Sequence, residues 1–255
     1  MINSQPIISV RNLVKKYDDL IAVNDVSFDV HVGEIFGLLG PNGAGKTTTL
    51  EIMETLRDPD SGDVIIDGHS IKNNKNSIKQ IIGVQLQQSG FYPNLSLMNL
   101  VHLFAGLYNM KVNVKEILNS VGLGDKIHAK FNKLSGGQKQ RFAVATTLIN
   151  KPKIIFLDEP TTGLDPHARR NLWEMIFDMK KNGTTVMLTT HYLDEAEQLC
   201  DRVGIIDLGK VIALDTPSVL IDNLIRSGFK RSEQVKDATL EDVFLNLTGK
   251  ELRDE

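Results

Sequence analysis

The sequence contains few of the residues that build disulfide frameworks and metal clusters. Its 255 residues include a single cysteine, Cys200, which excludes an internal disulfide framework and a metal site made of several cysteines. The six histidines are scattered, and no two of them stand at the i, i+4 spacing of a helical zinc site. We therefore expect Cys200 to be a small buried apolar residue.

A charge excess of one sign and long apolar runs are also missing. The 29 Lys and Arg residues stand against 32 Asp and Glu, a net charge of −3, so generic binding to nucleic acid or anionic lipid is not indicated. The first thirty residues are too charged to contain the apolar core of a signal peptide. Residues 80–110 carry no charge, but they are rich in Gln, Asn and Ser, whereas a spanning helix needs about 20 mostly apolar residues. We expect an ordinary globular chain without a membrane span.

Short apolar stretches alternate with helical patterns along most of the chain. Four stretches have the continuous apolar character of buried parallel strands: residues 34–39, 153–157, 184–190 and 203–207. A helical pattern follows each of the first three. Residues 7–10 and 22–30 instead alternate around a turn, and residues 91–150 read as mostly helical. This order predicts an α/β core with a parallel sheet, joined to a separate β region and a helical segment.

The strongest motif is Gly40-Pro41-Asn42-Gly43-Ala44-Gly45-Lys46-Thr47, which satisfies G-x-x-x-x-G-K-[ST] between a predicted strand and a predicted helix. Its glycines permit a loop whose backbone N–H groups point inward at an anion, and the helix N-terminus adds its positive end. Lys46 would reach the β- and γ-phosphates of a nucleotide, and the Thr47 hydroxyl would ligate Mg²⁺. Four more residues are expected to bind the nucleotide: Asn42, Gly43, Gly45 and Thr48.

Residues 154–159 form an apolar stretch that ends in two adjacent carboxylates. Asp158 is placed to supply the other half of the Mg²⁺ site, and Glu159 is placed to polarise an attacking water. Alone, the pair could be two ordinary acids that cap a strand. Together with a P-loop in the same chain, it favours nucleotide hydrolysis.

A second glycine-rich motif, Leu134-Ser135-Gly136-Gly137-Gln138, precedes another helical pattern. The run creates a helix N-terminus with free N–H groups and a hydroxyl, which is a second anion site. Standing alone, it would be read as an ordinary helix cap after a glycine turn.

Together the motifs resemble the ATP-binding subunit of an ABC transporter. Their order is P-loop, Leu-Ser-Gly-Gly-Gln, Asp-Glu-Pro, Gly-Leu-Asp-Pro and Thr-Thr-His, and the resemblance runs from about Ile8 to Phe244. It implies the ABC ATPase fold, a P-loop NTPase core with a parallel sheet, an N-terminal antiparallel β subdomain and an inserted α-helical subdomain. It also implies one domain over residues 1–255, divided into a core with the β subdomain (1–88 and 151–230), a helical subdomain with the signature (89–150) and a short C-terminal helix (231–255).

The resemblance assigns roles near one nucleotide. Tyr17 resembles the aromatic that stacks on adenine, although it could instead be an edge-strand tyrosine. Gln87 resembles the Q-loop glutamine that contacts Mg²⁺ and the lytic water. The neighbouring Gln85 and Gln88 could also be matched to that position of the family. His191 resembles the switch histidine that contacts the γ-phosphate.

Other roles concern a second subunit. In the family, Ser135 and Gly137, with Gln138 beside them, complete the phosphate site that Lys46 builds in the partner. Asp165 resembles the D-loop aspartate, which lies across the dimer interface. Because the chain holds one P-loop and one signature, we expect a homodimer or heterodimer of ATPase subunits around ATP and Mg²⁺.

The implied function is that of an exporter's motor. Residues 190–197 and 239–245 most resemble ATPases that serve exporters of drugs, antibiotics, lipids or polysaccharides. The chain would be cytoplasmic, held at the inner face of the membrane by an integral membrane permease, and no nucleic-acid partner is expected. An importer ATPase is the nearest alternative, followed by an ABC ATPase acting on DNA or ribosomes and by a small-molecule kinase or GTPase. The segment between the P-loop and the signature is too short for the coiled coil of DNA-repair relatives. Ribosome-acting relatives carry two ATPase halves, whereas this chain has one. The run Asn132-Lys133-Leu134-Ser135 lacks the Asp of a guanine-reading motif, which argues against a GTPase.

The uncharged segment also predicts a docking face. Ser96 is a candidate N-cap for a helix over residues 97–108 that is apolar nearly all round, and such a helix is normally covered on every side. In the family, a groove beside the Q-loop receives a short helix of the membrane subunit. We expect Phe91, Tyr92 and Met98 to help form that groove and Gln87 to link it to the γ-phosphate, with burial inside the helical lobe as the alternative.

Overall fold

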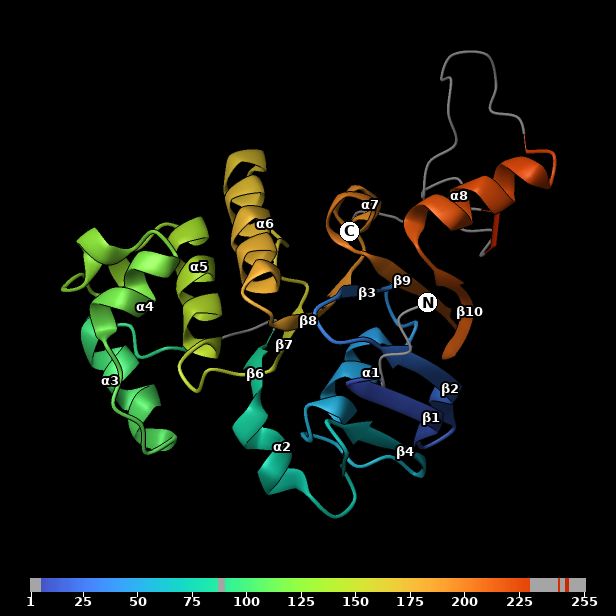
Figure 1. The fold of residues 1–255 in the computed structure, drawn as a ribbon, viewed down its shortest axis with the longest axis horizontal. Helices are drawn as coiled ribbons and strands as arrows, with labels where there is room; N and C mark the ends of the chain where they lie inside the picture. Colours follow the sequence, from blue (N-terminus) through green and yellow to red (C-terminus); the bar gives the residue numbers. More distant parts are fainter. Residues whose placement is uncertain (1–5, 87–89, 230–242, 244–245, 248–255) are drawn as a thin grey trace.

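The computed structural model describes residues 6–86, 90–229, 243 and 246–247. A four-stranded antiparallel sheet has the order β2-β1-β4-β5 and contains β1 (Ile8–Tyr17), β2 (Leu20–Val30), β4 (Ser61–Ile66) and β5 (His69–Ser70). It forms because β1 and β2 alternate apolar and polar residues around a tight turn at Asp18. The expected antiparallel region is therefore present in the N-terminal part of the chain (Figure 1).

A six-stranded sheet has the order β10-β9-β3-β8-β7-β6. Its strands are β3 (Ile35–Leu39), β6 (Ile82–Gln85), β7 (Ile154–Asp158), β8 (Thr185–Thr190), β9 (Arg202–Asp207) and β10 (Lys210–Asp215). All pairs are parallel except β9 with β10. Every residue of β3, β7 and β8 is buried, as expected for strands covered on both faces.

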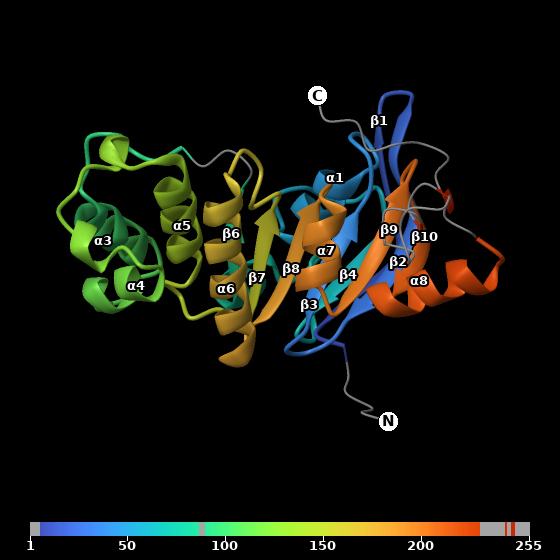
Figure 2. The ribbon, with the colours of Figure 1, turned by 90° about the horizontal axis from the view of Figure 1, so that it is seen from above.

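Helices cover the large sheet and extend beyond its β6 edge. The core helices are α1 (Lys46–Met53), α2 (Lys75–Ile81), α6 (Pro166–Lys181), α7 (Leu193–Leu199) and α8 (Pro217–Arg226). A separate helical lobe contains α3 (Leu97–Leu107), α4 (Val114–Ser120), two short 3-10 turns (Gly124–Lys126 and Phe131–Lys133) and α5 (Gly136–Thr147). Figures 1 and 2 show this lobe on the far side of β6 from the antiparallel sheet.

Alternate residues of the central strands enter two different hydrophobic cores. Ile155 and Leu157 of β7 pack with the helical lobe, α6 and α7, whereas Ile154 and Phe156 pack with α1 and the antiparallel sheet. The large sheet is thus held between two apolar layers. This arrangement fixes the loops at the carboxyl ends of its parallel strands.

The expected fold is confirmed, with several elements that periodicity did not reveal. Strand β6 and helix α2 were not predicted because each is short, and helix α8 was missed although Thr216 caps it and its apolar residues recur at helical spacing. Cys200 is buried as expected. The predicted C-terminal helix (231–255) lies almost wholly outside the described residues. No described helix is long and apolar enough to cross a membrane.

Candidate functional site

The glycine-rich loop joins β3 to α1, as the sequence predicts. Gly45 caps α1 with a φ of 102°, and a Cβ atom there would lie 2.3 Å from the carbonyl oxygen of Ala22. Only glycine fits this conformation and this close approach. Asn42 and Gly43 are exposed, Gly43 has a φ of 79°, and Thr48 is half-buried in the first turn of the helix.

Lys46 is a buried cation at the start of α1. Its side chain is 5% exposed, and Nζ donates to the carbonyl oxygens of Gly40 (2.8 Å) and Pro41 (3.2 Å). Burial lowers the pKa of the ammonium, while Glu159 and Asp158 oppose that shift. Nζ also lies 3.9 Å from Oε1 of Glu159, so the lysine joins the P-loop to the carboxylates of β7.

Asp158 ends β7 between two hydroxyl donors. Thr189 Oγ1 donates to Asp158 Oδ1 at 2.5 Å, and Thr47 Oγ1 donates to the same oxygen at 3.4 Å. Burial raises the pKa of this carboxyl, and the two hydroxyls favour its charged form. The predicted Mg²⁺ ligands Thr47 and Asp158 therefore come together at one point.

Glu159 follows Asp158 in a backbone conformation that non-glycine residues rarely adopt, with a φ of 47°. Its N–H donates to the carbonyl oxygen (3.2 Å) and the hydroxyl (3.0 Å) of Thr189. Thr162 Oγ1 donates to Glu159 Oε2 at 3.2 Å. The surrounding contacts hold the residue in this conformation, and such backbone strain is typical of functional positions.

His191 stands directly after β8, beside the carboxylate of Glu159. Its Nδ1 lies 3.2 Å from Glu159 Oε2. The parallel pairing of β7 with β8, in which Asp158 is opposite Thr189, brings the two loops together. Lys46, Thr47, Asp158, Glu159 and His191 thus form one cluster at the carboxyl ends of β3, β7 and β8, where α/β sheets usually bind ligands.

Ser135 and Asp165 belong to a second group of predicted residues. Ser135 and Gln138 form a capping box at the start of α5, so the ordinary cap considered for this motif is present. Asp165 caps α6 through the N–H groups of His167 and Ala168, and the bond to Ala168 is the main cause that lowers its carboxyl pKa. One pocket is lined by Ser135, Gly136, Gly137, Gln138, Arg141, Gly163, Leu164, Asp165, His167, Ala168 and Asn171.

This signature pocket shares no lining residue with the Lys46 cluster. The structure brings Ser135, Gly137, Gln138 and Asp165 to each other but places them on the α5–α6 side of the chain.

Two further predicted residues, Tyr17 and Gln87, are not part of the Lys46 cluster as the structure describes it. Tyr17 lies at the end of β1, half-buried, with the Arg57 guanidinium carbon 5.5 Å and Lys15 Nζ 5.7 Å from its ring centre. Gln87 lies outside the described residues. The neighbouring Gln85 is buried at the end of β6, and its amide donates to the carbonyl oxygen of Leu86.

Sequence reasoning missed three polar residues of the Lys46 cluster and its surroundings. Thr189 and Thr162 support Asp158 and Glu159 through hydroxyl groups, but threonine in a strand or loop carries no specific signal. Glu54, at the end of α1, is 2% exposed, and burial first, then Asp158 and Glu51, raise its carboxyl pKa to about 8. Its burial is a tertiary property that the sequence does not encode locally.

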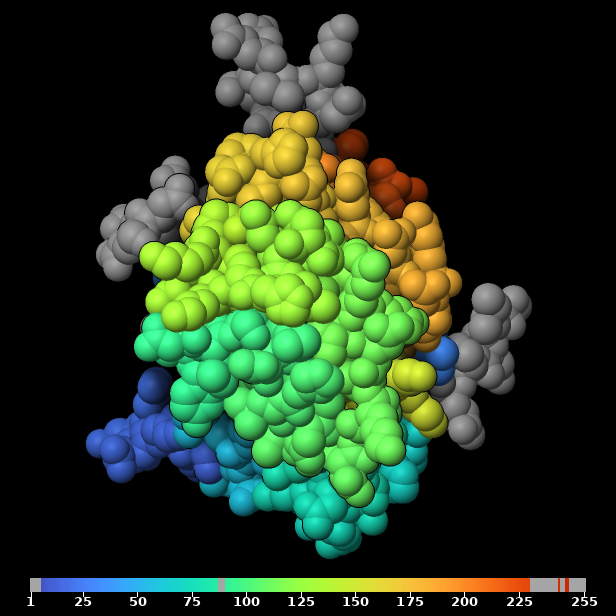
Figure 3. All heavy atoms as spheres, turned by 90° about the vertical axis from the view of Figure 1, so that its left-hand side faces the viewer, coloured from blue at the N-terminus to red at the C-terminus, as the bar shows by residue number. Residues whose placement is uncertain are grey.

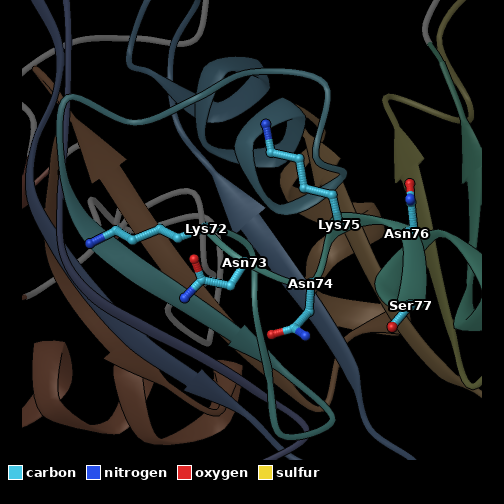
Figure 4. A pocket seen from close by; sticks show the side chains of 6 residues that line it. All are labelled: Lys72, Asn73, Asn74, Lys75, Asn76 and Ser77. Carbon is cyan, nitrogen blue, oxygen red and sulfur yellow. The ribbon is translucent and has the colours of Figure 1, made fainter.

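A second hollow lies on the connection between β5 and α2. Its lining is one continuous segment: Lys72, Asn73, Asn74, Lys75, Asn76 and Ser77. The side chains project in different directions from the loop before α2 and from the first turn of that helix (Figure 4). None of the predicted functional residues lines this hollow, so the nucleotide chemistry is assigned to the Lys46 cluster.

Comparison with known proteins gives consistent matches. A family described as "ABC transporter" matches residues 23–162. The Nod factor export ATP-binding protein I of Burkholderia orbicola (strain AU 1054) is 35% identical over 299 residues, covering 97% of this chain and 98% of that protein. The probable multidrug ABC transporter ATP-binding protein YbhF of Escherichia coli (strain K12) is 38% identical and covers 95% of this chain, which spans 42% of that longer protein.

Solved structures share the whole architecture. An ATP-binding subunit of an ABC transporter superposes with a TM-score of 0.81 at 27% identity, covering 95% of this chain and 99% of that one. A dimeric ATP-binding cassette in a post-hydrolysis state, bound to ADP and Pi, superposes with a TM-score of 0.74 at 28% identity, covering 82% of this chain and 98% of that one.

Proposed function

This chain belongs to the ABC transporter family as an ATP-hydrolysing subunit, and from that premise we propose that it is the motor of an exporter. The observation that carries the motor function, ATP hydrolysis, is the cluster of Lys46, Asp158, Glu159 and His191 at the ends of neighbouring strands. Lys46 is the cation that would bind phosphate, and Asp158 offers an oxygen ligand for Mg²⁺. Glu159 is a second carboxylate, which is proposed to act as the base and not as a metal ligand.

ATP fits the P-loop, and Mg²⁺ fits the oxygen atoms beside it. The described residues contain no cluster of three or more His, Cys, Asp or Glu side chains that could hold a metal alone. Mg²⁺ commonly binds through one or two carboxylates together with substrate phosphates and water. Thr47 and Asp158, whose oxygens are 3.4 Å apart, match this pattern. When bound, the ion would neutralise phosphate charge, and Gln87 is proposed as a further ligand.

Within this site each residue has a distinct task. Lys46 binds the β- and γ-phosphates, and its burial strengthens that attraction because little water screens it. Glu159 accepts a proton from the attacking water, while the Thr162 hydroxyl donates to its Oε2 and His191 Nδ1 lies 3.2 Å from the same oxygen. His191 then contacts the γ-phosphate, and Tyr17 stacks on the adenine from the tip of β1.

The signature pocket supplies the second half of the site. We propose that Ser135, Gly137 and Gln138 of one subunit close over the nucleotide held by Lys46 of the other, with Asp165 at the interface. The helix N-terminus of α5 and the Ser135 hydroxyl provide donors for the γ-phosphate. The dimeric cassette among the similar structures supports this pairing.

Export rests on the named relatives. One similar protein is named a Nod factor export ATP-binding protein, and another is named a probable multidrug ABC transporter ATP-binding protein; the first of these names states outward transport. We propose that this chain likewise lies on the cytoplasmic face of the membrane, bound to an integral membrane permease. The substrate then depends on that permease, because this chain supplies the ATPase.

The structure bears differently on the three residues predicted for the docking face. Phe91 is half-buried and packs against Phe104, Phe131 and Phe142 with ring centres 5.6, 4.8 and 5.2 Å away, which favours the alternative of burial inside the helical lobe for this residue. Helix α3 begins after the predicted cap Ser96, and part of its apolar surface is exposed in this chain. Leu103 is 39% and Leu107 is 74% exposed.

Tyr92 and Met98 remain as the proposed contacts for the permease. Tyr92 is 65% exposed, and Met98 is half-buried against the lobe. The lobe forms a continuous outer surface (Figure 3). An amphipathic helix of the permease would cover part of this face.

Affinity purification of the chain from membranes tests the export proposal. The expected result is a co-purifying polytopic membrane protein whose loss abolishes efflux of its substrate. Recovery of a solute-binding protein and loss of uptake would instead establish an importer.

A further inference from the structure

The first turn of α6 presents two faces to two functional groups. Ala168 and Asn171, three residues apart, line the signature pocket. Arg169 and Trp173, four residues apart, lie on another face and reach the segment that follows His191. The helix therefore stands between the Ser135–Asp165 pocket and the loop that carries the switch histidine.

The contact with the His191 loop is a stack of three side chains. The guanidinium carbon of Arg169 lies 4.5 Å from the ring centre of Tyr192. The Tyr192 ring lies 4.2 Å from the His191 ring, at an interplanar angle of 39°. A planar guanidinium over an aromatic face is a directional contact that an ammonium does not reproduce.

Two more contacts fix the same face. Arg169 Nη1 lies 3.4 Å from Asp194 Oδ2, and Trp173 Nε1 donates to the buried Glu195 Oε1 at 2.9 Å. Both acids are on α7, directly after the His191 loop. Arg169 is 22% exposed and Asp194 is 55% exposed, so the arginine side chain is partly shielded from water while its ion pair with Asp194 is a surface contact.

The other end of the connection is the subunit interface. The Arg169 N–H donates to the Asp165 carbonyl oxygen at 2.9 Å in the first turn of α6. A Cβ atom on Gly137 would lie 2.9 Å from Ala168 Cβ, so the signature backbone packs directly on this turn. These two contacts join the signature and Asp165 directly to the turn that holds Arg169.

We infer that Arg169 is a positioning residue for His191, acting through the Tyr192 ring, and that it ties the ATP site to the signature pocket of the same subunit. This inference rests on the proposed function of His191 and of the pocket. Arg169 itself touches no nucleotide. Its loss should leave ATP binding intact and impair the step that needs His191 in place beside Glu159.

The test compares Arg169→Met with Arg170→Met on the full chain. Arg170 is the adjacent, exposed arginine of the same helix, and it provides a matched control. Arg169→Met should lower kcat for ATP hydrolysis about tenfold, because small misplacements of a reacting group are costly, with the KM for ATP within about twofold. Arg169→Lys should fall nearly as far, since it keeps the charge and loses the planar stack, whereas Arg170→Met should match the unmodified protein.

A second pair of variants guards against simple unfolding. Tyr192→Phe keeps the ring and should retain most turnover, whereas Tyr192→Leu should behave like Arg169→Met. Thermal melting and the fluorescence of Trp173, the single tryptophan of the chain, verify that each variant is folded.

The outcomes separate this inference from the proposed function. Turnover within about twofold of normal in Arg169→Met and Tyr192→Leu, with Glu159→Gln inactive, would overturn the inference alone. A rise in KM at unchanged kcat, or an equal loss in Arg170→Met, would also overturn it. Normal turnover in Glu159→Gln would overturn the proposed catalytic site instead.

Discussion

His191 Nδ1 lies 3.2 Å from Glu159 Oε2, although the two residues belong to separate loops of the sheet. Glu159 has a positive φ of 47°, and its Oε2 accepts a hydrogen bond from the Thr162 hydroxyl. His191 follows the end of β8, and its ring packs against the Tyr192 ring. The structure therefore brings the proposed base and the switch histidine side by side.

Replacing Glu159 by Gln should separate ATP binding from ATP hydrolysis. The amide keeps the shape of the side chain but cannot accept the proton of the attacking water, so turnover should fall by about 10²–10⁴-fold. Nucleotide affinity should be preserved, as measured by equilibrium binding beside a phosphate-release assay. Lys46→Ala is the contrasting variant, with a loss of affinity. A Glu159→Gln protein that hydrolyses ATP normally would remove Glu159 from the mechanism.

Two subunits should pair when ATP is bound and not consumed. In the Glu159→Gln background, saturating ATP should convert monomer to dimer in size-exclusion chromatography. Adding Ser135→Arg should block the conversion, because the bulk would occupy the place of the partner's γ-phosphate. Ser120→Arg, an exposed serine at the end of α4, is the matched control and should still pair. A persistent monomer in the Glu159→Gln protein would favour a different ATPase chain as partner.

Glu54 should make the fold less stable as the pH rises. Its carboxyl has a pKa of about 8 in the folded protein and an ordinary value of 4.5. Between these two values the folded state holds a proton that the unfolded state has released, so the free energy of unfolding decreases as the pH rises through this window. Glu54→Gln should remove this slope and be more stable than the unmodified protein at pH 8, on the order of a few kcal/mol.

Urea denaturation at pH 5 and pH 8 measures the effect, and Glu116→Gln on the exposed start of α4 is the control. An identical pH slope in the Glu54→Gln and unmodified proteins would show that the Glu54 carboxyl titrates normally.

Phe91 and Tyr92, adjacent in the chain, should behave differently. Phe91→Ala removes a ring from a cluster of four phenylalanines and should lower the free energy of unfolding by about 3 kcal/mol. Tyr92→Asp should leave stability and ATPase activity nearly unchanged while abolishing co-purification with the permease, because the side chain is 65% exposed. If the Tyr92→Asp protein still co-purifies with the permease, the assignment of Tyr92 to the docking face is wrong.

Motifs with short spacing made much of the site predictable. The P-loop, the Asp158-Glu159 pair and the helix from Pro166 to Lys181 depend on neighbouring residues, and the structure has each of them where the sequence placed it. Ser96 likewise caps α3 as expected. Local chemistry, such as glycine conformation, capping and strand apolarity, carries enough information for these elements.

Long-range contacts decided the rest. No local pattern distinguishes Phe91, which packs among three distant rings, from Tyr92, which faces outward. The burial of Glu54 beside Asp158 and the stack of Arg169 on Tyr192 likewise join residues far apart in the chain.

The sequence by itself determined that this chain has a phosphate-binding loop, a carboxylate pair and a signature, because each is written within a few consecutive residues. Only the tertiary structure decided that His191 meets Glu159 and that the Ser135 group lies in a separate pocket. The physical reason is that the pairing of parallel strands sets which loops are neighbours, and this pairing depends on the packing of both sheet faces at once.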